Sequence, residues 1–188
     1  MIVTAIVMWI TVLFNGITRS DEHIDGRWAQ VEAVLQRRLD LIPQLVATVQ
    51  NYATHEQETL LGVAQARARA LGTLEGTAGA APKSRKALES LEQAQQHVTS
   101  ALTQLLAIAE HYPDLKANAS FLTLQSQLEG TENRITVERQ RYNDAVLAYN
   151  ARLRIFPSNV IANMFGFELR EYFESKVGAE EPVVVPTR

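Results

Sequence analysis

The side chains that could support catalysis or bind a metal are few in this chain and do not complete a known motif. His55 and Glu56 begin like the helical zinc-protease motif, but Thr59 stands where the second histidine ligand belongs. No serine has the glycine-flanked turn of a hydrolase nucleophile. Cysteine is absent, which excludes disulfides and cysteine ligands. We therefore expect no catalytic residue, no metal and no cofactor.

Phosphate binding and nucleic-acid binding are also disfavoured. Gly72, Gly76 and Gly79 cluster, but no Gly-Lys-Ser/Thr follows them and no strand precedes them, so they do not form a phosphate-binding loop. The net charge is -3 and the pI is about 5.8. Because Lys and Arg do not gather into one block, we expect no nucleic-acid partner.

Two polar residues interrupt apolar helical stripes. Glu56 and Gln95 each occupy a position where the spacing predicts a core residue. Glu56 could be a catalytic carboxylate, the two could form a polar layer that fixes helix register, or each could lie at an edge open to water. In an antiparallel register Glu56 would lie level with residues 95 to 99, so we expect it to face the same layer as Gln95.

The elements that position these residues are predicted to be helices. Apolar residues recur every three and four positions between residues 28 and 67, which is typical of a helix packed along a nearly parallel or antiparallel partner. The members of this stripe are Leu35, Leu39, Ile42, Val46, Val49, Ala53, Leu60 and Val63. Pro43 lies inside it, and the unbroken stripe favours a kinked continuous helix over a new helix beginning at Pro43. Similar stripes predict a second helix over 84–111 and a third over about 114–155, with a loop over 72–83.

The N-terminus has the composition of a membrane anchor. Residues 1 to 14 carry no charge, and the apolar stretch to Ile17 is about 26 Å long at 1.5 Å per residue. A signal peptide and a buried core helix are the alternatives, but no basic residue precedes the stretch and no cleavage site follows it. Residues 1–18 are therefore expected to contact membrane lipid as a single span. Basic residues follow this segment and none precedes it, so the positive-inside rule places the bulk of the chain in the cytoplasm.

The C-terminal third contains an aromatic cluster and a repeated dipeptide. Tyr142-Asn143 and Tyr149-Asn150 are seven residues apart and so share a helix face, where we interpret the tyrosines as packing residues. After Pro157 comes an apolar segment that includes Phe165, Phe167, Tyr172 and Phe173. It could cover the end of the bundle, or form a surface that contacts a partner or a membrane. The helix lengths place the Tyr112–Pro113 turn level with Pro43, and this segment at the end of the bundle far from the membrane.

Several stretches of the chain resemble the LemA family of bacterial membrane-anchored helical proteins. They are LQRRLDLIPQLVATVQNYATHE from residue 35, YPDLKAN from 112, ERQRYNDAVLAYN from 138 and FPSNVIANMFGF from 156. The resemblance implies a single-pass anchor and an antiparallel helical bundle, and it transfers no enzyme activity. The predicted fold is all-α: an N-terminal transmembrane helix followed by an elongated antiparallel bundle of three long helices and a short C-terminal helix. We divide it into an anchor (1–18), a bundle (19–177) and a disordered tail (178–188).

These observations favour a non-enzymatic, membrane-tethered scaffold or adaptor at the bacterial cell membrane that binds still unidentified proteins. The alternatives are a membrane-anchored hydrolase that uses Glu56, and a structural membrane protein that self-associates as a homo-oligomer. An exposed apolar patch usually marks an interface, and a charged helix face is a second candidate. The expected partner-binding residues are Phe165, Phe167, Tyr172, Phe173, Arg37 and Arg38.

Overall fold

The structure is a computed structural model that describes residues 1–173, and these residues form helices and loops without a strand. The helices are α1 (Ile2–Gln50), α2 (Gln57–Glu75), α3 (Arg85–Ala109), α4 (Pro113–Lys116), α5 (Ala119–Arg154) and α6 (Ser158–Phe165). This confirms the all-α prediction with a long apolar N-terminal helix. The predicted tail, 178–188, lies outside the described residues.

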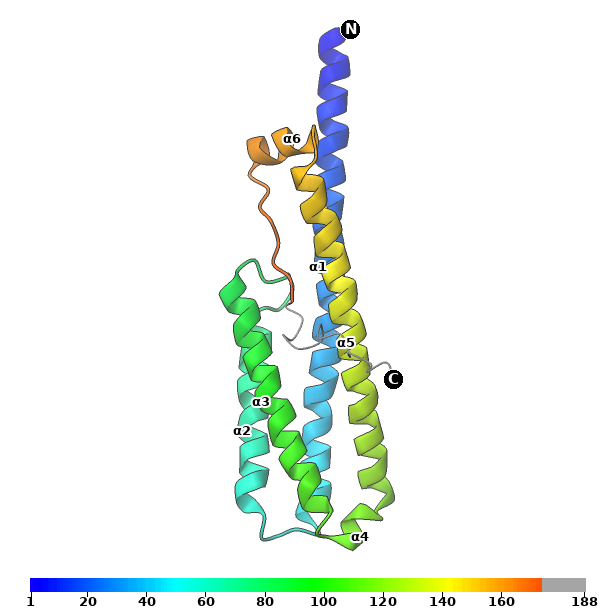
Figure 1. Ribbon diagram of the computed structural model, residues 1–188, viewed down its shortest axis with the longest axis vertical. Coiled ribbons are helices and arrows are strands. Elements are labelled where there is room, and N and C mark those ends of the chain that lie inside the picture. The colour runs from blue at the N-terminus through cyan, green and yellow to red at the C-terminus, as the bar shows by residue number, and fades with distance from the viewer. Residues whose placement is uncertain (174–188) are drawn as a thin grey trace, which may run out of the picture.

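The molecule is an elongated bundle built on two long antiparallel helices, α1 and α5 (Figure 1). Arg152 of α5 donates hydrogen bonds to the Gly16 carbonyl and the Ser20 hydroxyl at one end of this pair, and Arg38 forms an ion pair with Glu132 nearer the other. The shorter α2–α3 hairpin packs beside the half of α1 that is distant from the N-terminus (Figure 1). Four helices thus form the bundle there, whereas the N-terminal half of α1 packs against α5, α6 and the segment that follows α6.

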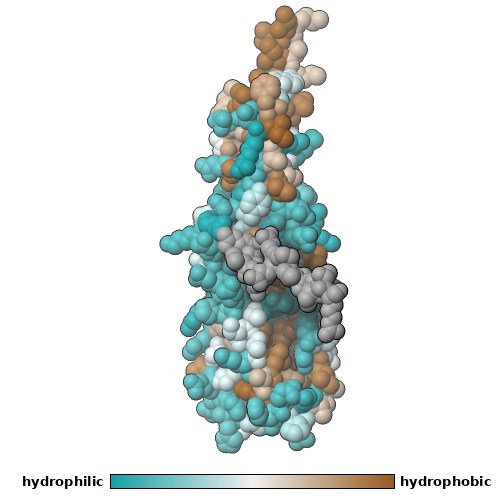
Figure 2. Space-filling view, viewed as in Figure 1, coloured by the Kyte–Doolittle hydropathy of each residue, from teal (hydrophilic) through white to brown (hydrophobic). Residues whose placement is uncertain are grey.

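Helix α1 continues without a break from the N-terminal apolar segment into the bundle. Residues 19–27, which join the apolar segment to the bundle, lie inside it. Its apolar end is exposed, and α1 is long and apolar enough to cross a membrane. In Figure 2 this end of the molecule is largely hydrophobic, while the bundle below it is mostly hydrophilic with a hydrophobic band in its lower half. An apolar helix end that lacks a protein partner is the composition expected of a lipid-facing segment.

Pro43 lies within α1, as the continuous apolar stripe predicted. Proline has no N–H, so the carbonyl of Leu39, four residues earlier, lacks its usual helical donor. The Arg67 side chain of α2 supplies one, with its Nε 2.8 Å from the Leu39 oxygen. The cost of a proline inside the helix is therefore reduced by a hydrogen bond from the neighbouring helix, which also pins α2 to α1.

The first helix ends earlier than its apolar pattern predicted. Residues 51–56 form a turn, and α2 runs back along α1, so the stretch treated as one helix is a helical hairpin. The stripe did not reveal the turn because Ala53, Leu60 and Val63, which follow the end of α1, are all buried as expected. The bundle therefore has four long helices rather than three.

The additional turn between α1 and α2 changes which inter-helix turns lie beside each other. The Tyr112 hydroxyl is 3.3 Å from Glu56 Oε1, so the α3–α4 turn lies beside the α1–α2 turn and not beside Pro43. The predicted Glu56–Gln95 layer is consequently wrong, because Gln95 contacts Arg38 instead.

Helix α6 lies at the opposite end of the bundle from the one predicted. The Phe165 ring packs against Phe14 of α1, with ring centroids 4.9 Å apart, and Phe167 lies 5.6 Å from the same ring. Figure 1 shows α6 beside α1 and roughly perpendicular to it, after the end of α5 and on the side of the anchor. The error has the same origin: with four long helices, α5 runs back toward the N-terminal segment.

Candidate functional site

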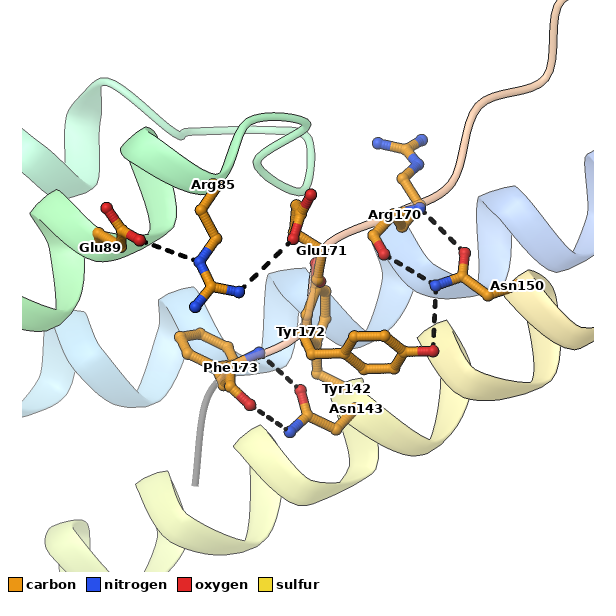
Figure 3. Close-up of polar contacts among 9 residues, drawn as sticks. All are labelled: Arg85, Glu89, Tyr142, Asn143, Asn150, Arg170, Glu171, Tyr172 and Phe173. Carbon is orange, nitrogen blue, oxygen red and sulfur yellow. Dashed lines mark hydrogen bonds and ion pairs between the residues drawn. The ribbon is translucent and has the colours of Figure 1, made fainter. Parts of the chain in front are cut away.

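Residues 166–173, here called the strap, leave α6 and run back along the bundle without helical structure (Figure 1). Gly166 makes the reversal possible, because its φ of 73° lies in the left-handed region that favours glycine. Asn150 of α5 binds the strap through both atoms of its side-chain amide. Its Oδ1 accepts the Arg170 N–H at 3.0 Å and its Nδ2 donates to the Arg170 carbonyl at 2.9 Å (Figure 3). The amide thus replaces the neighbouring strand that an extended segment would otherwise need.

Asn143 repeats this arrangement at Phe173. Its Oδ1 accepts the Phe173 N–H and its Nδ2 donates to the Phe173 carbonyl, each at 2.9 Å (Figure 3). All four bonds go to the backbone of the strap. The two asparagines therefore hold the strap mainly by its backbone, and Asn150 Nδ2 also donates to the Tyr172 hydroxyl at 3.1 Å (Figure 3).

The two tyrosines of the repeat bind backbone as well. Tyr142 donates to the Glu171 carbonyl at 3.2 Å, and Tyr149 donates to the Glu168 carbonyl at 3.1 Å. Burial raises the pKa of each hydroxyl to about 12, so both keep the proton that they donate. The repeated Tyr-Asn dipeptide is thus a ladder of hydrogen-bonding groups on one face of α5. The expectation that it serves only packing is incomplete.

The spacing of this ladder matches an extended chain. Seven helical residues advance about 10.5 Å along α5, and three extended residues advance about 10 Å. Asn150 and Asn143 bind strap residues three apart, and so do Tyr149 and Tyr142, with the strap running antiparallel to α5. A heptad repeat of hydrogen-bonding dipeptides can therefore follow an extended backbone with little loss of register.

Side chains of the strap fix its position further. Arg170 is buried, and its guanidinium lies 2.8 Å from Asp21 and 3.9 Å from Asp25 on α1. It also donates to the Ala81 carbonyl at 3.4 Å, while Asp25 accepts the Ala81 N–H at 3.0 Å. Arg170 thereby joins α1, the α2–α3 loop and the strap. Since a buried charge is costly unless it is paired, these contacts specify one position for the strap.

Phe173 ends the described strap in an aromatic pocket. Its ring stacks on Trp28 at a centroid distance of 6.0 Å and meets Tyr142 edge-on at 5.3 Å. The Arg139 guanidinium lies 4.3 Å from the ring centroid, a cation–π geometry. This buried side chain is the main apolar contact of the strap.

A groove of about 560 Å³ begins at Phe173 and lies between α3 and α5, with α1 contributing to it. Its lining combines apolar residues with amides and charged side chains. The lining residues are Val31, Leu35, Arg38, Leu91, Glu92, Gln95, Gln96, Thr99, Glu132, Ile135, Thr136, Arg139, Gln140, Asn143 and Phe173. Because the groove is lined by Phe173 of the strap and by Asn143, which binds Phe173, the groove continues the path of the strap.

Polar contacts cross the groove at the end that is distant from Phe173. Arg38 is buried, donates to Thr99 at 2.8 Å and to Gln95 at 3.4 Å, and forms an ion pair with Glu132 at 3.2 Å. Burial lowers the pKa of Arg38, and the Glu132 carboxylate opposes that shift. The Nε2 of Gln95 is buried and has no hydrogen-bond partner among residues 1–173. A donor of this kind would be satisfied by a carbonyl oxygen placed in the groove.

The predicted partner-binding residues occupy different environments. Arg38 was expected on an exposed charged face, and this is wrong, because it points into the bundle. Phe173 is likewise buried. Phe165 and Arg37 are exposed, and Phe167 and Tyr172 are partly buried. Their role in partner binding stays a prediction.

Glu56, the proposed hydrolase residue, lies in the α1–α2 turn at the end of the bundle distant from the N-terminus. The Tyr112 hydroxyl is its partner, and the carboxylate raises the pKa of Tyr112 in addition to the larger effect of desolvation. Glu56 does not line the groove. Within residues 1–173, no cluster of three or more His, Asp or Glu side chains has the geometry of a metal site.

Sequence reasoning missed the backbone-binding role of Asn143 and Asn150 and the ion pairs of Arg170. The Tyr-Asn repeat was the available signal. The role of the repeat depends on contacts with the strap, and the sequence of the strap has no periodicity that would predict where it binds.

A long helix with an exposed apolar end, joined to a four-helix bundle, defines a membrane-associated helical protein. The chain belongs to the LemA family, whose model matches residues 27–186. Magnetosome protein MamQ 2 of Paramagnetospirillum magneticum is 24% identical over 200 aligned residues, which cover 98% of this chain and 73% of that protein. Magnetosome protein MamQ of Magnetospirillum gryphiswaldense is also 24% identical, over 208 residues that cover 98% and 74%. Protein LemA of Metamycoplasma hominis is 22% identical over 148 residues, covering 79% of this chain and 63% of that protein.

Proposed function

We propose that this protein is a non-enzymatic scaffold tethered to the bacterial cell membrane by residues 1–18, and that its groove holds an extended segment of a partner protein. The observation that carries the proposal is the strap. It is an extended segment already bound to α5 through backbone hydrogen bonds, and the groove continues its path. The arginines that follow the N-terminal segment favour a bundle on the cytoplasmic side.

The groove has the chemistry that an extended peptide needs. Amides at Gln95, Gln96 and Gln140 can donate to and accept from a peptide backbone, and one of these donors is buried without a partner. Leu91 and Ile135 offer an apolar floor. An extended segment presents alternate side chains to opposite sides, so it can bury apolar residues against this floor and leave the others in water.

The test is photo-crosslinking in the native cell. A benzophenone amino acid is introduced at Gln96 or Thr136 beside the groove, and at Arg69, exposed on α2, as the control. Mass spectrometry then maps the cross-linked peptides. We expect both groove positions to capture the same segment of another protein, and Arg69 not to capture it.

Three results would refute the groove as a partner site. The groove positions could yield no product above the Arg69 control, or they could capture only residues 174–188 of the same chain. Capture of a second copy of this chain would instead support the self-associating structural protein. A variant with Gln140→Trp should lose the product while keeping its helicity, because Gln140 is exposed at the groove and the larger side chain would occupy part of it.

A further inference from the structure

Helix α6 and its flanks expose an unusual amount of apolar surface. The exposed apolar residues are Ile155, Phe156, Val160, Met164, Phe165 and Leu169. Phe156 is 77% exposed and Met164 is 64% exposed, although α6 buries Ile161 and Ala162 on its other side. A soluble bundle gains nothing from this arrangement, since burying such side chains would lower its free energy.

The position of this apolar surface indicates what it contacts. Phe165 packs on Phe14, which lies in the uncharged segment that precedes Arg19. Helix α6 therefore lies where the anchor enters the bundle, and it extends sideways from α1 (Figure 1). The exposed apolar surface of α1 and that of α6 meet at this level, so the two form one continuous apolar end of the molecule. We propose that α6 and its flanking residues rest in the membrane, at the boundary between acyl chains and head groups.

Charged residues mark the boundary on the bundle side. Arg19 and Arg154 are exposed within two turns of Phe14 and of α6, respectively. Arg152, which bonds to Ser20 at 2.7 Å, lies at the same level. These cations can reach lipid phosphates, whereas Glu168 is the exposed acidic residue next to α6. The arrangement of apolar residues bordered by arginines is that of a helix lying in a membrane interface.

This inference rests on the proposed membrane anchor, and the experiment tests the two separately. The chain has no cysteine, so single nitroxide labels can be placed in the full-length protein at Val12→Cys, Met164→Cys and Leu122→Cys. All three positions are exposed, and Leu122 belongs to the first turn of α5, at the opposite end of the bundle. The labelled proteins are reconstituted into vesicles of phosphatidylethanolamine with a minority of phosphatidylglycerol. Collision rates are measured with oxygen, which concentrates in lipid, and with a nickel chelate, which stays in water.

We expect the Met164 label to resemble the Val12 label, with an oxygen-to-nickel collision ratio at least tenfold above that of Leu122. If Val12 reports lipid but Met164 resembles Leu122, α6 lies in water and the inference is overturned. A Met164 label protected from both reagents would also overturn it, because α6 would then contact protein. If Val12 itself reports water, the proposed anchor fails. Circular dichroism that matches the unlabelled protein shows that each variant is folded.

Discussion

Replacing Asn150 with Ala tests how the strap is held. The substitution removes three hydrogen bonds, one of them to the Tyr172 hydroxyl, and leaves the N–H and carbonyl of Arg170, a buried residue, without the Asn150 amide. Each buried unpaired group costs about 1–3 kcal/mol. Alanine returns roughly 0.5 kcal/mol because it favours the helix more than asparagine does. We therefore expect the strap to be destabilised by about 2–4 kcal/mol, while α1 and α5 remain paired.

Hydrogen exchange measures this loss directly. A change of about 2–4 kcal/mol in local opening speeds exchange of the Arg170 amide by about 30- to 1,000-fold, since each 1.4 kcal/mol is a factor of ten. The measurement uses the full chain in detergent and follows peptides that cover the strap. Asn133→Ala, at an exposed position of the same helix, is the matched control and should change nothing. Unchanged protection of Arg170 in a folded Asn150→Ala protein would refute the ladder.

Three further substitutions test the bundle. Arg67→Met removes the donor to the Leu39 carbonyl and should lower the free energy of unfolding by about 1–2 kcal/mol. In a Pro43→Ala background the loss should be much smaller, because alanine at this position restores the helical N–H. Equal losses in the two backgrounds, measured by denaturant unfolding, would contradict this. The pKa of Tyr142 is raised to about 12, so the folded chain keeps a proton that the unfolded chain loses near its usual pKa of about 10. The free energy of unfolding should therefore fall as the pH rises from about 10 to 12. In urea unfolding measured across this pH range, Tyr142→Phe should make that fall smaller. The same pH dependence in the wild type and in Tyr142→Phe would disprove it. Val49→Asp buries an unpaired charge and should destabilise by about 3 kcal/mol or more in thermal melts, whereas Gln50→Asp on the exposed face should change stability by less than ~0.5 kcal/mol.

The sequence predicted the core of the bundle well, because apolar periodicity is a local property. Leu35, Leu39, Ile42 and Val49 are buried as the stripe indicated, and Val46 is partly buried. Apolar periodicity also failed to predict the α1–α2 turn. A helical hairpin keeps both of its apolar faces toward one core, so the stripe passes through the turn without a change of phase, and no glycine or proline marks residues 51–56.

The candidate site was much less predictable, because its residues are recognised by partners distant in the chain. Arg38 follows Arg37 and looks equally exposed in the sequence, yet Thr99 and Glu132 provide it with a buried polar environment. The Asn143 and Asn150 amides bind backbone groups 20 to 30 residues away. No local pattern distinguishes an asparagine that binds a strap from one that faces water. The groove is a consequence of these pairings and could be found only from the folded chain.

Because α1 is a single unbroken helix, a change in the tilt of its membrane segment would rotate the whole bundle. From Phe14 to Gln50 the helix is about 54 Å long, so a tilt of about 10° would displace its far end by about 9 Å. Transmembrane helices tilt when bilayer thickness changes. With no hinge between membrane and bundle, such a tilt cannot be absorbed by bending at residues 19–27. A partner held in the groove, which α1 lines between Val31 and Arg38, would therefore move with the bundle, by less than the far end does, when the thickness of the surrounding membrane changes.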